Sequence, residues 1–270
     1  MKEITAPELL AVLRRIESKG THELAHRALR LAGQIFRYGI ATGRAERSPA
    51  SDLQGALTPV VTKHHAAITE PHKVADLLLD LDGYTGYPAT IAALRLAPMV
   101  FVRPGELRLA LWADINLDSM EWRYQSTKKD VDLIVPLCTQ AVSILGELHK
   151  LTGHGRYVFP SIRTGERPMS ENTVNAALRR LGYTKEEMVG HGFRATARTI
   201  LDEVLGVRVD LIEHQLSHKV KDPNGRAYNR TSFLPERKLM MQQWADYLDK
   251  LKAGTVQIPD KQAQQLIGTP

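Results

Sequence analysis

One short stretch of β-type sequence lies between long stretches with helical periodicity, and it limits the folds open to this chain. Residues 121–125 (EWRYQ) alternate between apolar and polar side chains, residues 131–137 (VDLIVPL) are rich in β-branched side chains, and the polar STKKD joins them. Two such segments joined by a short polar turn indicate a β-hairpin. We therefore predict an α+β fold that is mainly α with one small antiparallel β-sheet or hairpin.

Helical periodicity accounts for most of the remaining chain. Helices are expected at residues 6–18, 21–41, 70–84, 87–102, 138–150, 170–181, 191–204, 208–217 and 236–252. In the second of these, apolar residues recur at helical spacing opposite three arginines: Leu24, Ala28, Leu31, Ile35 and Tyr38 against Arg27, Arg30 and Arg37. Residues 47–69 combine turn residues with weak periodicity, which is typical of a linker.

The composition favours a globular protein with an anionic partner. Of 270 residues, 43% are hydrophobic, so a core can be buried. The net charge of +6 and the isoelectric point near 9.4 suggest a polyanion as partner. The single cysteine, Cys138, excludes an internal disulfide, and no run approaches the roughly 18 apolar residues of a membrane span. With no secretory signal at the N-terminus, we expect a cytosolic protein.

Two basic positions in the first half of the chain are candidates for phosphate binding. Arg103 precedes Pro104 and Gly105 at the start of an expected helix, which is a good place for a phosphate. Its alternative role is that of a surface arginine that caps a turn. Lys128 lies in the hairpin turn beside Lys129, where most lysines are only solvated.

Two further motifs lie in the second half. In HGFR, His191 and Arg194 are three residues apart at the start of an expected helix, as if to meet an anion. Farther on, His218 precedes a turn-rich loop, and Tyr228 lies between two arginines, Arg226 and Arg230. Most tyrosines are packing residues, but a tyrosine in so basic a segment is less easily explained in that way.

Metal and hydrolase chemistry find little support. His214 and His218 are four residues apart, as zinc ligands are, but the stretch lacks the glutamate of the metalloprotease motif. The nucleophile elbow of serine hydrolases and the glycine-rich loop that cradles nucleotide phosphates are also missing from the sequence. We therefore expect no metal site and no nucleotide cofactor.

Six of these residues occur in an order that resembles the catalytic set of the tyrosine recombinases, the lambda-integrase class. They are Arg103, Lys128, His191, Arg194, His218 and Tyr228. The local sequence around these residues also resembles the family, in the motifs RPGEL, LWADI, TKK, IVPL, HGFR, LSHK and AYNR. The stretch from AYNR to WADYLD is similar to prophage integrases. The resemblance covers about residues 5–252.

The resemblance implies how the chain is divided. Residues 1–55 would form a partial helical core-binding domain, 56–70 a linker, 71–252 a catalytic domain of the tyrosine recombinase fold, and 253–270 a C-terminal tail. An arm-binding domain is expected ahead of residue 1, so the chain is expected to be part of a longer protein. The family suggests that the helix at 236–252 docks on a neighbouring protomer, whereas its apolar face also suits packing on its own chain.

The resemblance also implies an activity: site-specific DNA recombination for integration or excision of a prophage or genomic island. Tyr228 would form a 3′-phosphotyrosine, Lys128 would protonate the leaving 5′-oxygen, and His191 would accept or relay the proton of the tyrosine. Three donors would stabilise the phosphate charge: Arg103, Arg194 and His218. No cofactor is implied.

The implied partners are double-stranded DNA attachment sites, bound by a homo-tetramer, with DNA-bending and directionality factors as possible additions. Other basic residues would contact DNA: Arg27, Arg30, Arg37, Lys129, Arg198, Arg226 and Arg230. The expected location is the bacterial cytosol or nucleoid. Two alternatives stay open: a catalytically silent DNA-binding protein of the same fold, and a DNA relaxase like the type IB topoisomerases.

Overall fold

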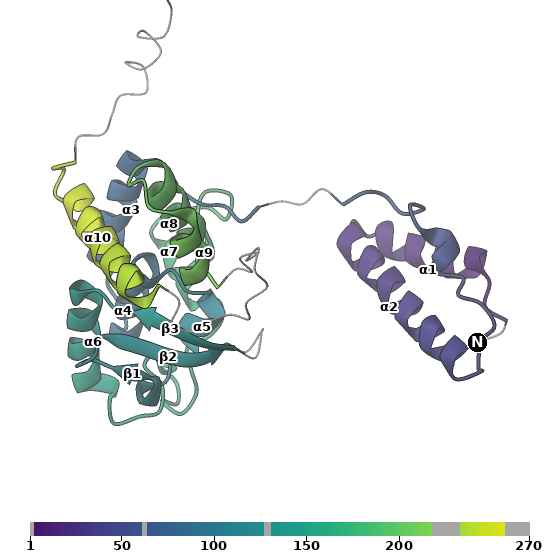
Figure 1. Ribbon diagram of the computed structural model, residues 1–270, viewed down its shortest axis with the longest axis horizontal. Coiled ribbons are helices and arrows are strands. Elements are labelled where there is room, and N and C mark those ends of the chain that lie inside the picture. Colours follow the sequence, from purple (N-terminus) through teal and green to yellow (C-terminus); the bar gives the residue numbers. More distant parts are fainter. Residues whose placement is uncertain (1–2, 61–63, 127–130, 218–232, 257–270) are drawn as a thin grey trace, which may run out of the picture. The chain divides into compact units, whose positions relative to one another are not determined.

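The computed structural model describes residues 3–60, 64–126, 131–217 and 233–256. The chain forms two compact units, residues 1–64 and 65–270 (Figure 1). The first unit contains α1 (Ala6–Glu17), α2 (His22–Ala41) and the 3-10 helix η1 (Ser51–Leu53). The second contains α3 (Pro71–Gly83), α4 (Pro88–Val100), α5 (Pro104–Arg108), η2 (Trp112–Asp114), β1 (Ile115–Asn116), β2 (Glu121–Ser126), β3 (Val131–Pro136), α6 (Thr139–Thr152), α7 (Thr173–Arg180), α8 (Gly192–Glu203), α9 (Val209–Gln215) and α10 (Leu234–Lys252).

The first unit is built on the packing of α1 against α2. Helix α1 begins where the sequence offers a capping box: Thr5 donates its main-chain N–H to Glu8 Oε2 at 2.8 Å. Leu13 of α1 and Ala25 of α2 meet Leu53 and Leu57 in a small core. The beginning of the predicted linker, which includes Leu57, therefore packs on this unit.

The apolar stripe of α2 does not face that core. Leu24, Leu31, Ile35 and Tyr38 are exposed, while the buried side of the helix carries Ala25, Gly33 and Phe36. The helix thus has two apolar arcs, and α1 covers only one of them. On the buried arc, a Cβ atom at Gly33 would lie 3.8 Å from the Cβ of Ala50, the residue before η1.

Helix α4 is the centre of the second unit. Most of its side chains are buried, and it contacts α3, α6, α7, α8 and α10. A helix that is apolar nearly all round is expected in the middle of a core, not on its edge. The helices that carry the predicted site residues are packed around this element.

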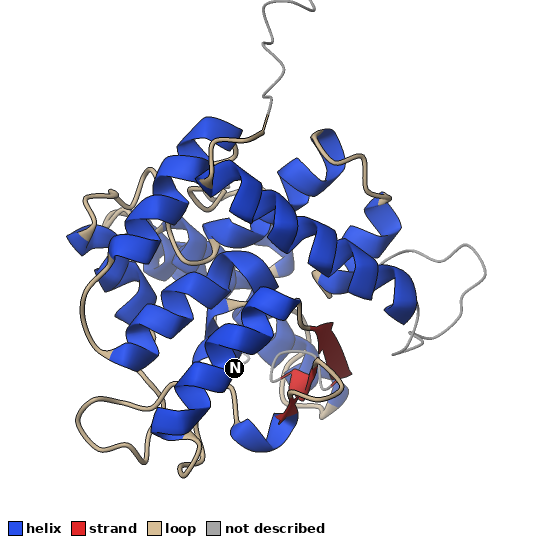
Figure 2. Cartoon of the chain, turned by 90° about the vertical axis from the view of Figure 1, so that its left-hand side faces the viewer, coloured by secondary structure: helices blue, strands red, loops and turns tan. Residues whose placement is uncertain are grey.

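The sheet of the second unit has the order β1-β2-β3 and is antiparallel throughout. In the β2–β3 hairpin, Trp122 pairs with Val135 and Tyr124 with Leu133. The hairpin agrees with the prediction, and β1 is an additional short strand. Helices (blue) make up most of the chain in Figure 2, and the strands (red) form one small patch. The predicted fold class, mainly α with a small antiparallel sheet, is confirmed.

The last helix, α10, packs on its own chain. It contacts α3 and α4, and the fully buried Trp244 donates its Nε1–H to the carbonyl oxygen of Pro98 in α4 at 2.8 Å. Figure 1 shows α10 (yellow) beside α3 and α4. Of the two alternatives for this helix, the structure shows packing within the chain.

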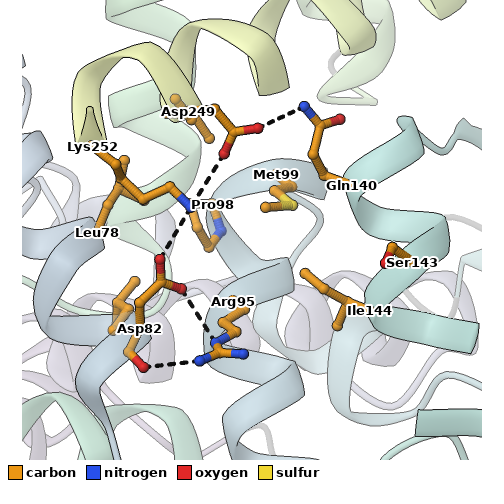
Figure 3. Close-up of a pocket in the computed structure, with 12 residues that line it drawn as sticks. Leu78, Asp82, Arg95, Pro98, Met99, Gln140, Ser143, Ile144, Asp249 and Lys252 are labelled. Carbon is orange, nitrogen blue, oxygen red and sulfur yellow. Dashed lines mark hydrogen bonds and ion pairs between the residues drawn. The ribbon is translucent and has the colours of Figure 1, made fainter. Parts of the chain in front are cut away.

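Charged groups reinforce that packing at a hollow between α3, α4, α6 and α10 (Figure 3). Asp82 pairs with Arg95 at 3.2 Å and with Lys252 at 3.1 Å. Lys252 also pairs with Asp249 at 3.2 Å, and Gln140 donates to Asp249 at 2.8 Å. Because these charges balance one another, we assign the cluster to fastening α10 and not to chemistry.

Candidate active site

Arg103 stands at the beginning of α5, where the sequence analysis placed it. Pro104 fixes the first helical residue, and the residue before a proline prefers an extended backbone, which Arg103 has. Glu106 then accepts two hydrogen bonds from Arg103, from its main-chain N–H at 3.0 Å and from Nη1 at 2.8 Å. The guanidinium is thus held by a carboxylate that is itself buried.

Tyr124 of β2 completes this group, and the sequence analysis did not identify it. Its hydroxyl donates to Glu106 Oε2 at 3.0 Å. Burial would raise the pKa of Glu106, but the hydrogen bonds and charge of Arg103 outweigh it and hold that pKa below its ordinary value of 4.5. Burial and then the charge of Glu106 raise the pKa of Tyr124. Tyr124 therefore stays protonated and positions Glu106; it is not poised as a nucleophile.

Arg194 lies in the first turn of α8 and is buried. Nη1 donates to the carbonyl oxygen of Phe101 at 2.9 Å, and Nη2 donates to that of Leu216 at 2.6 Å. Burial, and then the positive charge of Arg103, lower the pKa of Arg194 to about 10. The side chain keeps its charge at neutral pH, and two cationic forks from separate helices influence each other here.

The main chain near both acceptors of Arg194 has a residue with a positive φ angle. Phe101 ends α4 in the left-handed region, with φ at 34°, and Ser217, which follows Leu216, has φ at 54°. Residues without glycine's freedom adopt this conformation at a cost, and such positions cluster at functional sites. The two carbonyl groups that fix Arg194 therefore come from, or lie next to, strained backbone.

His191 occupies the N-cap position of α8, and its carbonyl oxygen accepts a hydrogen bond from Arg194 N–H at 3.2 Å. The prediction that HGFR begins a helix is confirmed, since α8 starts at Gly192. His191 also contacts His65, with ring centroids 4.3 Å apart. His65 was not among the predicted site residues, because it lies in sequence that was interpreted as a linker.

A second buried arginine, Arg237, ties the end of α9 to the beginning of α10. Its Nε and Nη2 donate to Gln215 Oε1 at 3.0 and 2.6 Å, and Nη2 also donates to the carbonyl oxygen of Ile134 in β3 at 2.5 Å. Gln215 immediately precedes Leu216, the residue that accepts from Arg194. The two arginines thus hold neighbouring residues of one chain segment.

This arrangement of helices and hairpin was compared with known proteins. Residues 69–233 match the model of the phage integrase family, and residues 1–56 match that of the phage integrase central domain. The chain belongs to the phage integrase family. The resemblance to tyrosine recombinases on which the sequence analysis relied is confirmed.

Curated relatives of this chain align with nearly its whole length. The integrase of Enterobacteria phage P4 is 37% identical over 265 residues, covering 92% of this chain and 60% of that protein. The putative protein IntB of Escherichia coli K12 is 35% identical over 263 residues, covering 92% of this chain and 66% of that protein. The chain therefore spans less than two thirds of the length of these relatives.

Solved structures show that the fold is shared. A lambda integrase dimer bound to a COC′ core site matches with a TM-score of 0.61 at 20% identity, covering 85% of this chain and 83% of that one. A lambda integrase tetramer bound to a Holliday junction gives 0.62 at 19% identity, covering 84% and 68%. At these identities the likeness supports the fold of the integrase-family chain.

Part of the predicted site lies outside the described residues. This applies to the catalytic candidates Lys128, His218 and Tyr228, and to the DNA-contact candidates Lys129, Arg226 and Arg230. Their roles stay predictions. Of the six-residue catalytic set, the structure describes Arg103, His191 and Arg194, and it brings the two arginines within electrostatic reach of each other.

The other DNA-contact candidates have different surroundings. Arg27, Arg30 and Arg37 are exposed along α2 in the first unit. In the second unit, Arg198 pairs with Glu213 at 2.9 Å and with Asp202 at 3.6 Å. Arg198 thus lies one turn after Arg194 on α8 but is occupied by carboxylates, which makes it a useful control for Arg194.

Neither a metal site nor a membrane span emerges from the described part of the chain. Nowhere in it do three or more His, Cys, Asp or Glu side chains gather as a metal ion would require. Its helices are also too short or too polar to cross a bilayer.

Proposed function

We propose that this chain is the core of a site-specific DNA recombinase, an integrase that cleaves and rejoins DNA through a 3′-phosphotyrosine during integration or excision of a prophage or genomic island. The observation that carries the proposal is the pair Arg103 and Arg194. Each guanidinium is fixed before any substrate binds, one by Glu106 and the other by two main-chain carbonyl groups.

A fixed pair of cationic forks suits phosphoryl transfer. The transition state places extra negative charge on the nonbridging oxygens, and guanidinium groups donate to them in a planar, bidentate geometry. Donors that are already oriented cost no reorganisation during the reaction, so each contributes roughly 3–4 kcal/mol by analogy with oxyanion holes. In this proposal Arg103 and Arg194 grip the scissile phosphate, and His218 adds a third donor.

The covalent step assigns one role to each remaining residue of the set. The hydroxyl oxygen of Tyr228 attacks phosphorus, the bond from phosphorus to the 5′-oxygen breaks, and a 3′-phosphotyrosine forms. Lys128 gives a proton to the leaving 5′-oxygen, and His191 takes the proton of Tyr228. Rejoining reverses these transfers with a new 5′-hydroxyl, so the bond energy is kept and no ATP is needed.

The proposed partner is double-stranded DNA carrying an attachment site. The chain is similar to lambda integrase, for which structures on a core site and as a tetramer on a Holliday junction are known. We propose that four copies act on two duplexes in the bacterial cytosol, with Arg27, Arg30 and Arg37 of α2 contacting the backbone. Contacts of this kind make binding salt dependent. DNA-bending and directionality factors are further candidate partners.

The test is covalent capture on nicked suicide duplexes tiled across the chromosomal junction beside the gene that encodes the chain. The chain and its Tyr228→Phe variant are incubated with each duplex and separated on a denaturing gel. We expect a slowly migrating protein–DNA band that Tyr228→Phe does not form. Binding without a band would instead favour the catalytically silent DNA-binding protein. A band accompanied by relaxation of supercoiled DNA, without strand exchange, would favour a topoisomerase.

A further inference from the structure

We propose that His65 is a positioning residue that holds the ring of His191 for proton transfer at the scissile phosphate. The inference rests on the proposed function, and nothing in the sequence motifs pointed to it. His65 is the first residue of the second unit, in the stretch that leads out of the first. That stretch has a fixed place against the start of α8.

The main chain of residues 66–68, which we call the strap, is fastened to α8 and the turn before it. Ala66 accepts a hydrogen bond from Val189 N–H at 3.4 Å, and the carbonyl oxygen of Ile68 accepts one from Thr196 Oγ1 at 2.6 Å. These two bonds bracket the HGFR motif from both sides. The strap therefore runs along the helix start that carries His191 and Arg194.

Gly192 shows how closely the strap approaches. A Cβ atom at this position would overlap the carbonyl oxygen of Ala66, and it would lie only 3.1 Å from the Cα of Ala67. Only glycine lets backbone come this near to backbone. Because Gly192 has no Cβ atom, the strap can pack directly beside the residue that follows His191.

His65 directly precedes the strap, and its ring contacts the ring of His191. The two centroids are 4.3 Å apart and the planes are inclined by 44°. His191 is the N-cap residue of α8, so its ring lies at the start of the helix that also carries Arg194. An aromatic neighbour at this distance restricts the direction of the ring, and a proton acceptor must be within hydrogen-bond reach of its donor to act.

A double-mutant cycle on cleavage of the nicked duplex tests the idea. We expect His65→Ala to slow single-turnover cleavage about tenfold, the upper range for loss of an aromatic pair, with DNA affinity changed less than about twofold. His65→Phe, which keeps a ring, should recover most of the rate. In a His191→Asn background, His65→Ala should cause no further loss, because the residue acts through His191. The matched control is His64→Ala, since His64 is the preceding residue and is exposed like His65.

Equal losses from His65→Ala in both backgrounds, or no loss in either, would overturn the inference. A second readout needs no DNA: imidazole NMR of the free chain, with the His191 signal assigned by its disappearance in His191→Asn. His65→Ala should shift that signal and His64→Ala should not. If the parent chain fails to cleave while the NMR shift is seen, the proposed function fails and the contact stands. If it cleaves and His65→Ala is silent, only this inference fails.

Discussion

Two arginines of the second unit are both buried, but they lie in different surroundings. Arg194 and Arg237 are similarly buried, and burial lowers the pKa of each to about 10. Both donate to main-chain carbonyl groups. They differ in their surroundings, because Arg194 also experiences the charge of Arg103, whereas the main acceptor of Arg237 is the neutral amide of Gln215. Arg194 thus belongs to a group of charges with Arg103 and Glu106, whereas Arg237 donates to uncharged acceptors.

The largest effect is expected for Arg194→Ala. Cleavage of the nicked duplex should fall by about a hundred- to thousandfold, as for the loss of one preorganised donor. Arg194→Lys should also lose most activity, since an ammonium group does not reproduce the planar fork. Single-turnover rates at saturating protein measure both.

The control is Arg198→Ala, one turn later on α8, where Glu213 and Asp202 already occupy the guanidinium. Its single-turnover rate at saturating protein should stay within about twofold, because Arg198 lies outside the proposed pair and a loss of DNA affinity is compensated at saturation. A loss comparable to that of Arg194→Ala would mean that α8 presents basic charge in general and that no specific pair exists.

Arg237→Ala is expected to act on stability. It leaves Gln215 Oε1 and the carbonyl of Ile134 without this donor and empties a buried space, so the free energy of unfolding should fall by about 2–4 kcal/mol. Urea denaturation followed by tryptophan fluorescence isolates the effect, since Trp112, Trp122 and Trp244 all lie in the second unit. Cleavage by Arg237→Ala is then measured at a temperature where both the variant and the parent chain are folded. If its rate falls as far as that of Arg194→Ala, the proposed difference between the two arginines is wrong.

A smaller effect should follow from Glu106→Gln. The folded-state pKa of Glu106 is below 4.5. Its ionised form therefore stabilises the fold above pH 4.5, and this contribution is lost as pH falls through the lower folded value. At pH 7 the variant should be about 1–2 kcal/mol less stable. The difference from the parent should shrink below pH 4.

Tyr124→Phe separates the two partners of that carboxylate, because it removes one hydrogen bond and leaves Arg103 in place. Its cost should be about 1 kcal/mol, with the acid dependence of the parent kept. If Glu106→Gln showed the same stability gap at pH 3.5 and pH 7, the carboxylate charge would have no part in holding Arg103.

The sequence was most informative where local signals and function coincide. Three elements each have a local cause in the sequence. The hairpin follows from the alternation of apolar and polar residues, and the helix after Arg103 follows from a proline at its first position. The helix at HGFR follows from a turn that precedes a periodic run. These elements lie where they were expected. The short strand β1 was missed because two residues carry no detectable periodicity.

What the sequence did not reveal depends on contacts between distant segments. Tyr124 was ordinary hairpin sequence until Glu106 was seen beside it, 18 residues away. His65 was interpreted as linker, and its contact with His191 spans more than a hundred residues. On α2, periodicity correctly predicted a helix, but it did not tell which of two apolar arcs faces α1. The periodicity of apolar residues identifies the apolar faces of a helix, but only the packing of the folded chain shows which face is covered and by which element.

The hydrogen bonds between Arg237 and Gln215 join two residues that lie 22 positions apart in the chain. Such a bond closes a loop, and the entropy lost in bringing its ends together is lost on folding, before any ligand binds. Leu216, whose carbonyl oxygen accepts from Arg194, follows directly after one of the two joined residues. The acceptor of Arg194 is therefore preorganised by a contact made on a different helix, α10.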